Sequence, residues 1–318
     1  MKTRELTRTT GQEIAANVAT RLVEAFLAGK SARTLTAYSH DLTDFAAFVG
    51  AGTIDDAART LLAQSPGDAN GTGLAYRAHL LERDLAPATV NRRLAAVRSL
   101  VSLAQVLGMI PWALHVAGVK SKAYRDTRGP GCNGFKALLA VAVTQKPYKA
   151  ARDVALLHLL YDLALRRGEV VALDLADVDL DGGTVAITGK GRTEKERRTL
   201  PLPTRAVLDA WRTERGTDPG PLFVNVDRAR KGGRLTGAGL YAVVRALGKK
   251  AGVTARPHGL RHAAITEALE LTGGNVRAVA KFSRHADLRT LGFYDDNRTD
   301  LAGEIAALVA ESAGPQAA

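Results

Sequence analysis

The chain of 318 residues is long enough for two domains, and its apolar content of 46% and charged content of 24% are ordinary for a globular protein. Its formal net charge of +12 favours a polyanionic partner such as nucleic acid, although a basic solvated surface or an acidic protein partner would give the same value. The single cysteine, Cys132, excludes an intrachain disulfide and disfavours a cysteine-based metal site.

Helical patterns dominate the first part of the chain. Apolar residues recur at helical spacing in the segments Gln12–Leu27, Thr34–Val49, Leu74–Glu82 and Ala88–Leu107. In the last of these, Arg92 and Arg93 point away from the apolar face, and Gly108 and Pro111 end the helix. These patterns predict a helical domain over residues 1–118.

A basic segment punctuated by glycine and proline, residues 119–131, predicts a linker. Its cations are either solvated or lie against phosphate groups, and the sequence leaves both interpretations open. No signal peptide is predicted, because residues 1–10 are polar and charged. No membrane span is predicted either, because polar residues and a proline interrupt the longest apolar stretch, Leu94–Val119. We therefore expect a cytoplasmic protein.

Residues 132–318 predict a second domain, in which helices surround a short β signal. Thr184–Thr188 alternates between apolar and polar residues, and Arg198–Leu202 is predicted as its return strand after a basic, glycine-containing loop. Helices are predicted at Gly134–Val143, Ala150–Leu165, Thr204–Arg215, Gly237–Ala251, Gly259–Leu271, Val276–Phe282 and Leu301–Ala310. The expected fold class is mainly α with a small antiparallel β-sheet.

Two motif matches in this domain fail on inspection. Asp177, Asp179 and Asp181 have the spacing that begins a calcium loop, but the twelfth position is Thr188, which cannot supply the bidentate carboxylate. The run from Gly189 to Gly191 lacks both the first glycine and the final Ser or Thr of a nucleotide-binding loop. We therefore expect no metal site and no nucleotide cofactor.

Four other passages carry a stronger signal. They are residues 160–173 (LYDLALRRGEVVAL), 188–192 (TGKGR), 258–262 (HGLRH) and 283–294, which begins SRHAD and ends FY. In this order and spacing they resemble the motifs of the tyrosine recombinases, the family of the phage-type integrases and the Xer recombinases. Residues 31–38 and 88–94 are similar to the helical core-binding domain of that family, so the resemblance spans most of the chain.

The resemblance implies DNA cleavage and rejoining at a phosphodiester. Arg166 and Arg261 stand at the family's two catalytic arginines, and their planar, permanently charged guanidiniums fit the non-bridging phosphate oxygens. Tyr294 stands at the nucleophile, which forms a 3′-phosphotyrosine. Lys190 stands at the general acid for the departing 5′ oxygen, although Arg192 and Lys195 are rivals on the same loop.

Three further residues are expected to support this chemistry. By resemblance, His258 accepts or orients the tyrosine proton, and His285 donates a hydrogen bond to the phosphate. Glu169 is expected to hold the Arg166 region without touching DNA. Each residue also has an ordinary structural explanation: an arginine pairs with a nearby carboxylate, a histidine fills a core, and a tyrosine packs beside a phenylalanine.

The sequence departs from the family pattern at two positions near these residues. Arg167 stands where an apolar residue is usual, so we expect its side chain to face solvent or DNA. Arg284 replaces the usual glycine before the histidine, which changes how His285 is presented. Neither departure removes a catalytic group.

The resemblance also implies the partners. Double-stranded DNA would be gripped by both domains, with Arg92, Arg93 and Arg192 among the contacts. Four protomers, either identical or shared with a paralogue, would assemble on two DNA sites, which makes the protein nucleoid-associated. The apolar segment Leu301–Ala310 packs either on a neighbour or on its own domain. The rival functions are a type IB topoisomerase and a DNA-binding protein of the same fold without catalysis.

Overall fold

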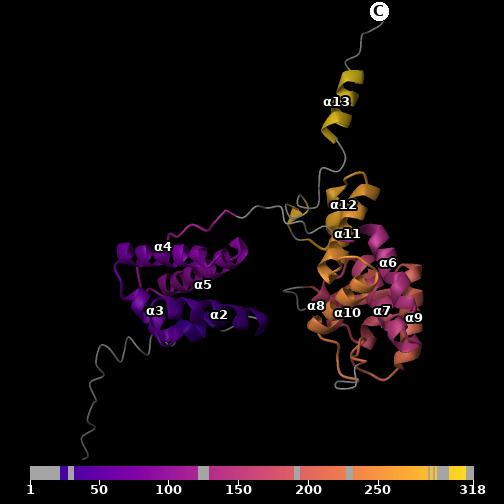
Figure 1. Cartoon of the computed structure of the whole chain (residues 1–318), viewed down its shortest axis with the longest axis horizontal. Helices are drawn as coiled ribbons and strands as arrows, with labels where there is room; N and C mark the ends of the chain where they lie inside the picture. The colour runs from indigo at the N-terminus through magenta and orange to yellow at the C-terminus, as the bar shows by residue number, and fades with distance from the viewer. Residues whose placement is uncertain are drawn as a thin grey trace, which may run out of the picture. The chain divides into compact units, whose positions relative to one another are not determined.

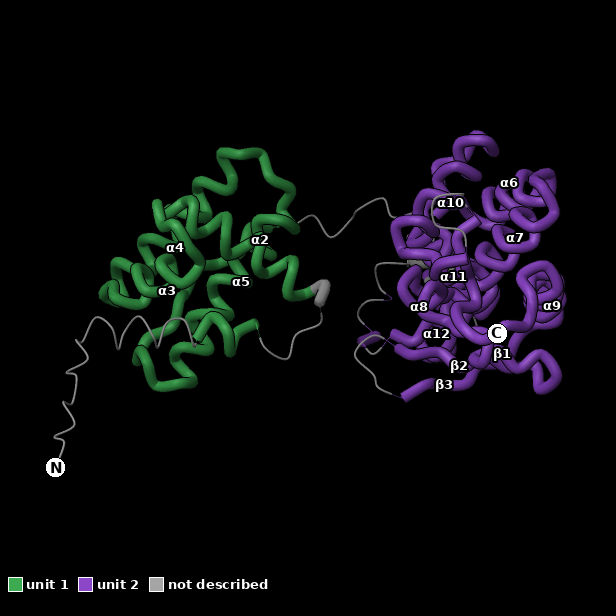
Figure 2. The backbone as a smooth tube through the Cα atoms, turned by 90° about the horizontal axis from the view of Figure 1, so that it is seen from below, with its two compact units in different colours: residues 1–122 green, residues 123–318 purple. Residues whose placement is uncertain are grey.

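The computed structural model describes residues 22–27, 32–120, 129–189, 194–226, 232–285, 287–288, 291 and 301–312. The chain divides into two compact units, residues 1–122 and residues 123–318 (Figures 1 and 2). Each unit has a hydrophobic core of its own, so each has the burial that a separate domain needs.

The described part of the first unit is helical. Its helices are α2 (Ala32–Phe48), α3 (Ile54–Leu62), α4 (Pro66–Glu82) and α5 (Pro87–Val106), and residues 22–27 are helical as well. The side chains of Thr53 and Ser65 accept hydrogen bonds from backbone N–H groups in the first turns of α3 and α4, which explains where both helices begin. Helix α5 packs against α2 and α4, and Phe45, Tyr76 and Leu100 are fully buried in the core.

A charged network links α2, α4 and α5 within this unit. Asp41 is 1% exposed and forms an ion pair with Arg92, with 2.9 Å between Nη1 and Oδ2. Asp44 pairs with Arg93 at 2.8 Å and accepts a hydrogen bond from the Tyr76 hydroxyl at 2.8 Å. Because a buried carboxylate is costly without a cation, these arginines are needed by the fold itself.

In the body of the second unit, helix α7 lies among other helices (Figure 1). The described helices of this unit are α6 (Gly131–Val143), α7 (Pro147–Tyr161), α8 (Arg167–Ala172), α9 (Leu202–Arg215), α10 (Gly237–Lys250), α11 (Pro257–Leu271), α12 (Val276–Ser283) and α13 (Leu301–Ser312). Helix α7 packs against α6, α8, α9 and α11, and Leu156, Leu159 and Leu160 are fully buried there. This helix therefore organises the core beneath the candidate site.

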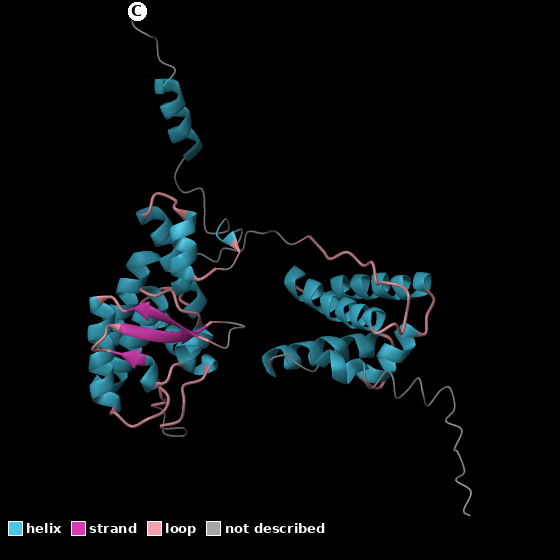
Figure 3. Cartoon of the chain, turned by 180° about the vertical axis from the view of Figure 1, so that it is seen from behind, coloured by secondary structure: helices cyan, strands magenta, loops and turns pink. Residues whose placement is uncertain are grey.

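A three-stranded antiparallel sheet lies in the second unit (Figure 3). Its order is β1 (Val178–Asp179), β2 (Thr184–Thr188) and β3 (Lys195–Thr199). Thr184 lies opposite Thr199, and the hairpin continues to the pair of Thr188 and Lys195. The alternation of β2 is explained by Val185 and Ile187, which are buried in the core.

The expected fold class, mainly α with a small antiparallel sheet, is confirmed, and strand β2 has the predicted bounds. The return strand was predicted at Arg198–Leu202 and instead lies at Lys195–Thr199. Helices α3 and α8 and strand β1 were not predicted. The linker predicted at residues 119–131 lies largely outside the described residues, as does most of the first predicted helix, Gln12–Leu27.

Within the described residues, no helix has the length and apolar character that crossing a membrane requires.

Candidate active site

The first side chain of the site, Arg166, is placed by a tight connection between α7 and α8. The chain turns sharply at Ala164, whose φ of 45° is in the left-handed region, and Arg166 then caps α8. Its backbone N–H donates to Glu169 Oε2 at 2.7 Å, and its Nη1 donates to Glu169 Oε1 at 2.9 Å. Glu169 thus holds Arg166 at both ends, while the Arg166 side chain stays 32% exposed.

The second arginine, Arg261, is buried inside the same region. It projects from α11, is 1% exposed, and donates through Nη1 to the carbonyl oxygen of Ala164. Its Nη2 donates to the carbonyl oxygen of Ser283 at 2.5 Å and lies 3.4 Å from Nε2 of His285. Arg261 therefore ties together the turn before Arg166, its own helix and the end of α12, three segments far apart in sequence.

His285 is oriented by two neighbours, one on each ring nitrogen. The Ser283 hydroxyl donates to the carbonyl of Val279 at 2.7 Å, so its lone pairs face Nδ1 of His285 at 2.9 Å. Nδ1 then carries the proton, and Nε2 is left as the acceptor that faces Arg261 Nη2. This arrangement suits a neutral imidazole.

Electrostatics favour the same protonation state. Partial burial, with Arg261 and Arg166 close by, lowers the pKa of His285 to about 4. The pKa of His258 is also lowered, first by the protein atoms around its ring and then by the same two arginines. His258 lies at the first turn of α11 and is an exposed residue, so the neighbouring protein covers only part of its surface. The site is therefore a concentration of positive charge.

The depressed pKa of His285 predicts acid sensitivity of the fold. A histidine that ionises near pH 4 when folded and near 6.5 when unfolded stabilises the fold fully above pH 6.5 and loses this contribution as the pH falls toward 4. We expect His285→Gln to reduce the drop in the free energy of unfolding between pH 7.5 and pH 4.5 by roughly 1–2 kcal/mol, after allowance for solvent screening. Urea denaturation at both pH values measures the drop, and an unchanged drop would contradict the burial of this imidazole.

Arg284, the departure from the family pattern, lies in the centre of this cluster. It has the left-handed conformation, with φ of 56°, and ends α12. Its guanidinium forms an ion pair with Oε2 of Glu169, and its backbone carbonyl accepts a hydrogen bond from Nη2 of Arg166 at 3.3 Å. Arg284 and Ser283 were not predicted as functional residues; the missing glycine was the only sign of the first, and the sequence carried none of the second.

Three of the predicted site residues, Lys190, Arg192 and Tyr294, lie outside the described residues. The base of the β2–β3 hairpin is described, and Arg198 on β3 donates to the carbonyl oxygen of Lys281 at 2.8 Å. This bond ties the hairpin, whose loop contains Lys190, to the helix that precedes His285. Lys195, the rival to Lys190, instead forms an ion pair with the buried Asp177.

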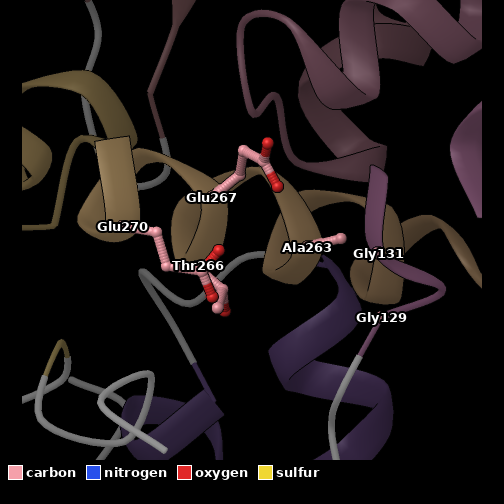
Figure 4. A pocket seen from close by; sticks show the side chains of 6 residues that line it. All are labelled: Gly129, Gly131, Ala263, Thr266, Glu267 and Glu270. Atoms are coloured by element: carbon pink, nitrogen blue, oxygen red, sulfur yellow. The ribbon is translucent and has the colours of Figure 1, made fainter. Parts of the chain in front are cut away.

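A small pocket opens on α11 and is not part of this cluster (Figure 4). It is lined by Gly129, Gly131, Ala263, Thr266, Glu267 and Glu270. At 3.6 residues per turn, its helical residues lie on the opposite side of α11 from Arg261. Its two carboxylates would repel a phosphate. Across the described ranges, no group of three or more His, Cys, Asp or Glu side chains is arranged to hold a metal ion.

Comparisons of the sequence and of the fold with known proteins all find integrases and recombinases. Residues 134–300 match the model of the phage integrase family. A tyrosine recombinase of Synechocystis sp. is 42% identical over 243 residues, which cover 75% of this chain and 77% of that protein.

Two solved structures resemble the fold. One is the XerH site-specific recombinase bound to its palindromic difH substrate in a post-cleavage complex, with a TM-score of 0.67 and 18% identity, over 96% of this chain and 90% of that one. The other is the Tn1549 transposon integrase in complex with transposon right end DNA, with a TM-score of 0.66 and 17% identity, over 93% of this chain and 99% of that one.

Proposed function

Because the chain belongs to the phage integrase family of tyrosine recombinases, we propose that it cuts and rejoins DNA at a specific site through a phosphotyrosine bond made by Tyr294. The observation that carries this proposal is the convergence of Arg166, Arg261 and His285 from three separate segments. Two guanidiniums beside a neutral imidazole, with Glu169 as the carboxylate that contacts Arg166, give this cluster a net positive charge, which supports an anionic ligand.

The proposed reaction is an in-line displacement at phosphorus. The Tyr294 oxygen attacks the scissile phosphate, the bond to the 5′ oxygen breaks, and Lys190 supplies the proton that the departing oxygen needs. Negative charge on the non-bridging oxygens is stabilised by Arg166 and Arg261. The energy of the bond is kept in the phosphotyrosine, so attack by a 5′ hydroxyl reverses the step and joins the strands without a nucleotide.

The two histidines take separate roles in this proposal. His258, with its lowered pKa, is neutral at pH 7 and can accept or orient the proton of Tyr294. His285 is neutral in the free protein, and its Nε2 donates to a phosphate oxygen only after protonation. The negative charge of a bound phosphate raises the pKa of this imidazole and so favours the donating form.

The proposed partner is double-stranded DNA, as the net charge of +12 and the DNA complex of the Tn1549 integrase suggest. We propose that both units contact the duplex and that four protomers, identical or shared with a paralogue, act on two sites. Helix α13 supports an assembly role because Leu308 and Val309 on it are 64% and 59% exposed. We propose that the protein acts in the cytoplasm, in association with the nucleoid.

The network in the first unit assigns different roles to Arg92 and Arg93. The Arg92 side chain is 46% exposed beyond its ion pair and can reach a phosphate, whereas that of Arg93 is 17% exposed and lies between Asp41 and Asp44. We expect Arg92→Ala to weaken DNA binding and to reduce the slope of log K against log salt by about one. Because Arg92 is the nearer partner of the buried Asp41, the same change should also lower the free energy of unfolding. Arg93→Ala should lower the free energy of unfolding by about 2 kcal/mol or more. DNA binding at several salt concentrations and thermal denaturation are measured for both variants. An Arg93→Ala variant that changes the salt dependence of binding as much as Arg92→Ala does would contradict these roles.

A nicked suicide substrate tests the proposed function. Such a duplex loses the short 5′-hydroxyl fragment after cleavage, so the covalent protein–DNA adduct accumulates and can be counted on a denaturing gel. We expect an adduct that forms without added metal or ATP. Reaction products from supercoiled plasmids then separate site-specific recombination from relaxation by a type IB topoisomerase. Binding to DNA with no adduct would favour a non-catalytic protein of the same fold.

A further inference from the structure

We infer that Arg284 is a positioning residue for the cleavage step. It pairs with the carboxylate of Glu169, which would otherwise cancel the positive charge of Arg166. This inference rests on the proposed function and extends it to a residue where the family usually has glycine. It concerns a cluster of three side chains, Arg166, Glu169 and Arg284, which meet from α8 and the end of α12.

Glu169 contacts both arginines through different oxygens. Oε1 accepts from Nη1 of Arg166 at 2.9 Å, and Oε2 forms the ion pair with Arg284 while also accepting the backbone N–H of Arg166. A second link is independent of the carboxylate, because the Arg284 carbonyl accepts Nη2 of Arg166 at 3.3 Å. The orientation of the Arg166 guanidinium is therefore determined by Glu169 and Arg284 together.

Burial separates the roles of the two arginines. The side chain of Arg166 is 32% exposed and can meet a phosphate, whereas that of Arg284 is 8% exposed and that of Glu169 is 5% exposed. Because Glu169 joins the two guanidiniums through its separate oxygens, we infer that Arg284 acts on DNA through Arg166. Its Nε is buried without a hydrogen-bond partner in the described part of the chain, so the pair with Glu169 is the main contact that holds its guanidinium.

The charges in this cluster explain why a buried arginine helps. Guanidiniums stay protonated in proteins, so Arg166 and Glu169 alone would form a pair with no net charge. With Arg284 the three side chains carry one net positive charge, which would stabilise the negative charge that develops on the phosphate. The pKa of His285 is lowered first by burial and then by the positive charges of Arg261, Arg166 and Arg284. Removal of Arg284 should therefore weaken the stabilisation of the transition state.

The backbone at this position provides a clean variant. Arg284 has φ of 56° and ψ of 42°, a conformation that glycine adopts more easily than any side-chain-bearing residue. Arg284→Gly should therefore fold without strain, and Glu169 keeps both of its contacts with Arg166. We expect the variant to have an undiminished melting temperature and unchanged DNA affinity, while its single-turnover cleavage rate falls about tenfold.

A double-mutant cycle distinguishes charge from packing. In the Arg284→Gly background, Glu169→Gln removes the neutralising charge and keeps an acceptor for Arg166, so cleavage should recover at least threefold. In the wild-type background, the same change leaves two arginines without an anion, so cleavage should fall. Arg284→Lys, which retains the charge, should keep most of the wild-type rate. A purely structural Arg284 would instead make the second substitution neutral or harmful in both backgrounds.

The experiment compares wild type, Arg284→Gly, Arg284→Lys, Glu169→Gln and the double variant that combines Arg284→Gly with Glu169→Gln. All are assayed on one nicked duplex, with DNA affinity and melting temperature measured in parallel. The sign reversal just described, at constant affinity, would support the inference. If wild type cleaves and Arg284→Gly cleaves at the same rate, the inference alone is overturned. It is also overturned if Arg284→Gly cleaves more slowly and the added Glu169→Gln lowers its cleavage rate further. A wild type that forms no adduct would overturn both this inference and the proposed function.

Discussion

Replacing Tyr294 by phenylalanine is expected to abolish the covalent protein–DNA adduct, with a loss of cleavage rate of at least roughly a thousandfold. The substitution removes one oxygen, and that oxygen is the atom proposed to bond to phosphorus. No other group proposed for the site is a nucleophile of comparable strength, since the guanidiniums are always protonated and the histidines are assigned to proton transfer and hydrogen bonding. A nicked duplex and a denaturing gel measure the loss.

A second tyrosine provides the matched control. Tyr241 on α10 is 37% exposed, and the guanidinium of Arg167 lies 5.9 Å from the centre of its ring. Tyr241→Phe also removes one phenolic oxygen but keeps the ring on which Arg167 packs, so we expect wild-type cleavage and DNA affinity. Tyr294→Phe should likewise bind DNA normally. Adduct formation by Tyr294→Phe at more than a small fraction of the wild-type rate would assign the nucleophile to another residue.

Replacing Arg261 by alanine is expected to damage both catalysis and folding. The guanidinium holds the carbonyl oxygens of Ala164 and Ser283 and faces His285 from a position that is 1% exposed. Its loss leaves two buried acceptors without their donor, so the free energy of unfolding should fall by about 2–4 kcal/mol. The cleavage rate should fall by a factor on the order of 10² to 10³, the usual effect of removing one charge-stabilising donor.

Arg261→Lys separates these two effects. Lysine keeps the positive charge, but a single ammonium group cannot reproduce the planar fork that reaches both carbonyl oxygens and the phosphate. We therefore expect an intermediate free energy of unfolding and a cleavage rate that stays well below that of wild type. Urea denaturation and single-turnover cleavage measure the two quantities on the same preparations. Full activity of Arg261→Lys would show that only the charge matters, and full stability of Arg261→Ala would contradict the contacts described for this side chain.

The fold was predictable where one face of an element is apolar and the element is long. Helix α5 and strand β2 were found because their buried residues recur at the periods of a helix and a strand. Helix α8 has only six residues and β1 only two, too few for any period to show. Strand β3 was displaced in the prediction because its inward positions carry charge, notably Arg198, which bonds to the Lys281 carbonyl instead of filling a core.

The candidate site was predictable only through resemblance to a family. Nothing in the local sequence indicates that Arg166, Arg261 and His285 meet. The bond from Arg166 to the Arg284 carbonyl spans 118 residues, and the bond from Arg261 to the Ala164 carbonyl spans 97. The role inferred for Arg284 could not be predicted, since it depends on a left-handed residue that brings a guanidinium to Glu169. The sequence also did not predict the ion pairs of Arg92 and Arg93 with Asp41 and Asp44. These pairs join two helices, and the sequence of one helix does not show which residues of another helix it contacts.

The most direct test of the proposed mechanism is a crystal structure of the protein bound to an uncleaved DNA site. The mechanism predicts that the guanidiniums of Arg166 and Arg261 hold the non-bridging oxygens of one phosphate, with the Tyr294 oxygen, from the same or a neighbouring protomer, about 3–3.5 Å from its phosphorus. A complex in which the Tyr294 oxygen approaches a phosphate that neither arginine contacts would contradict the proposed mechanism.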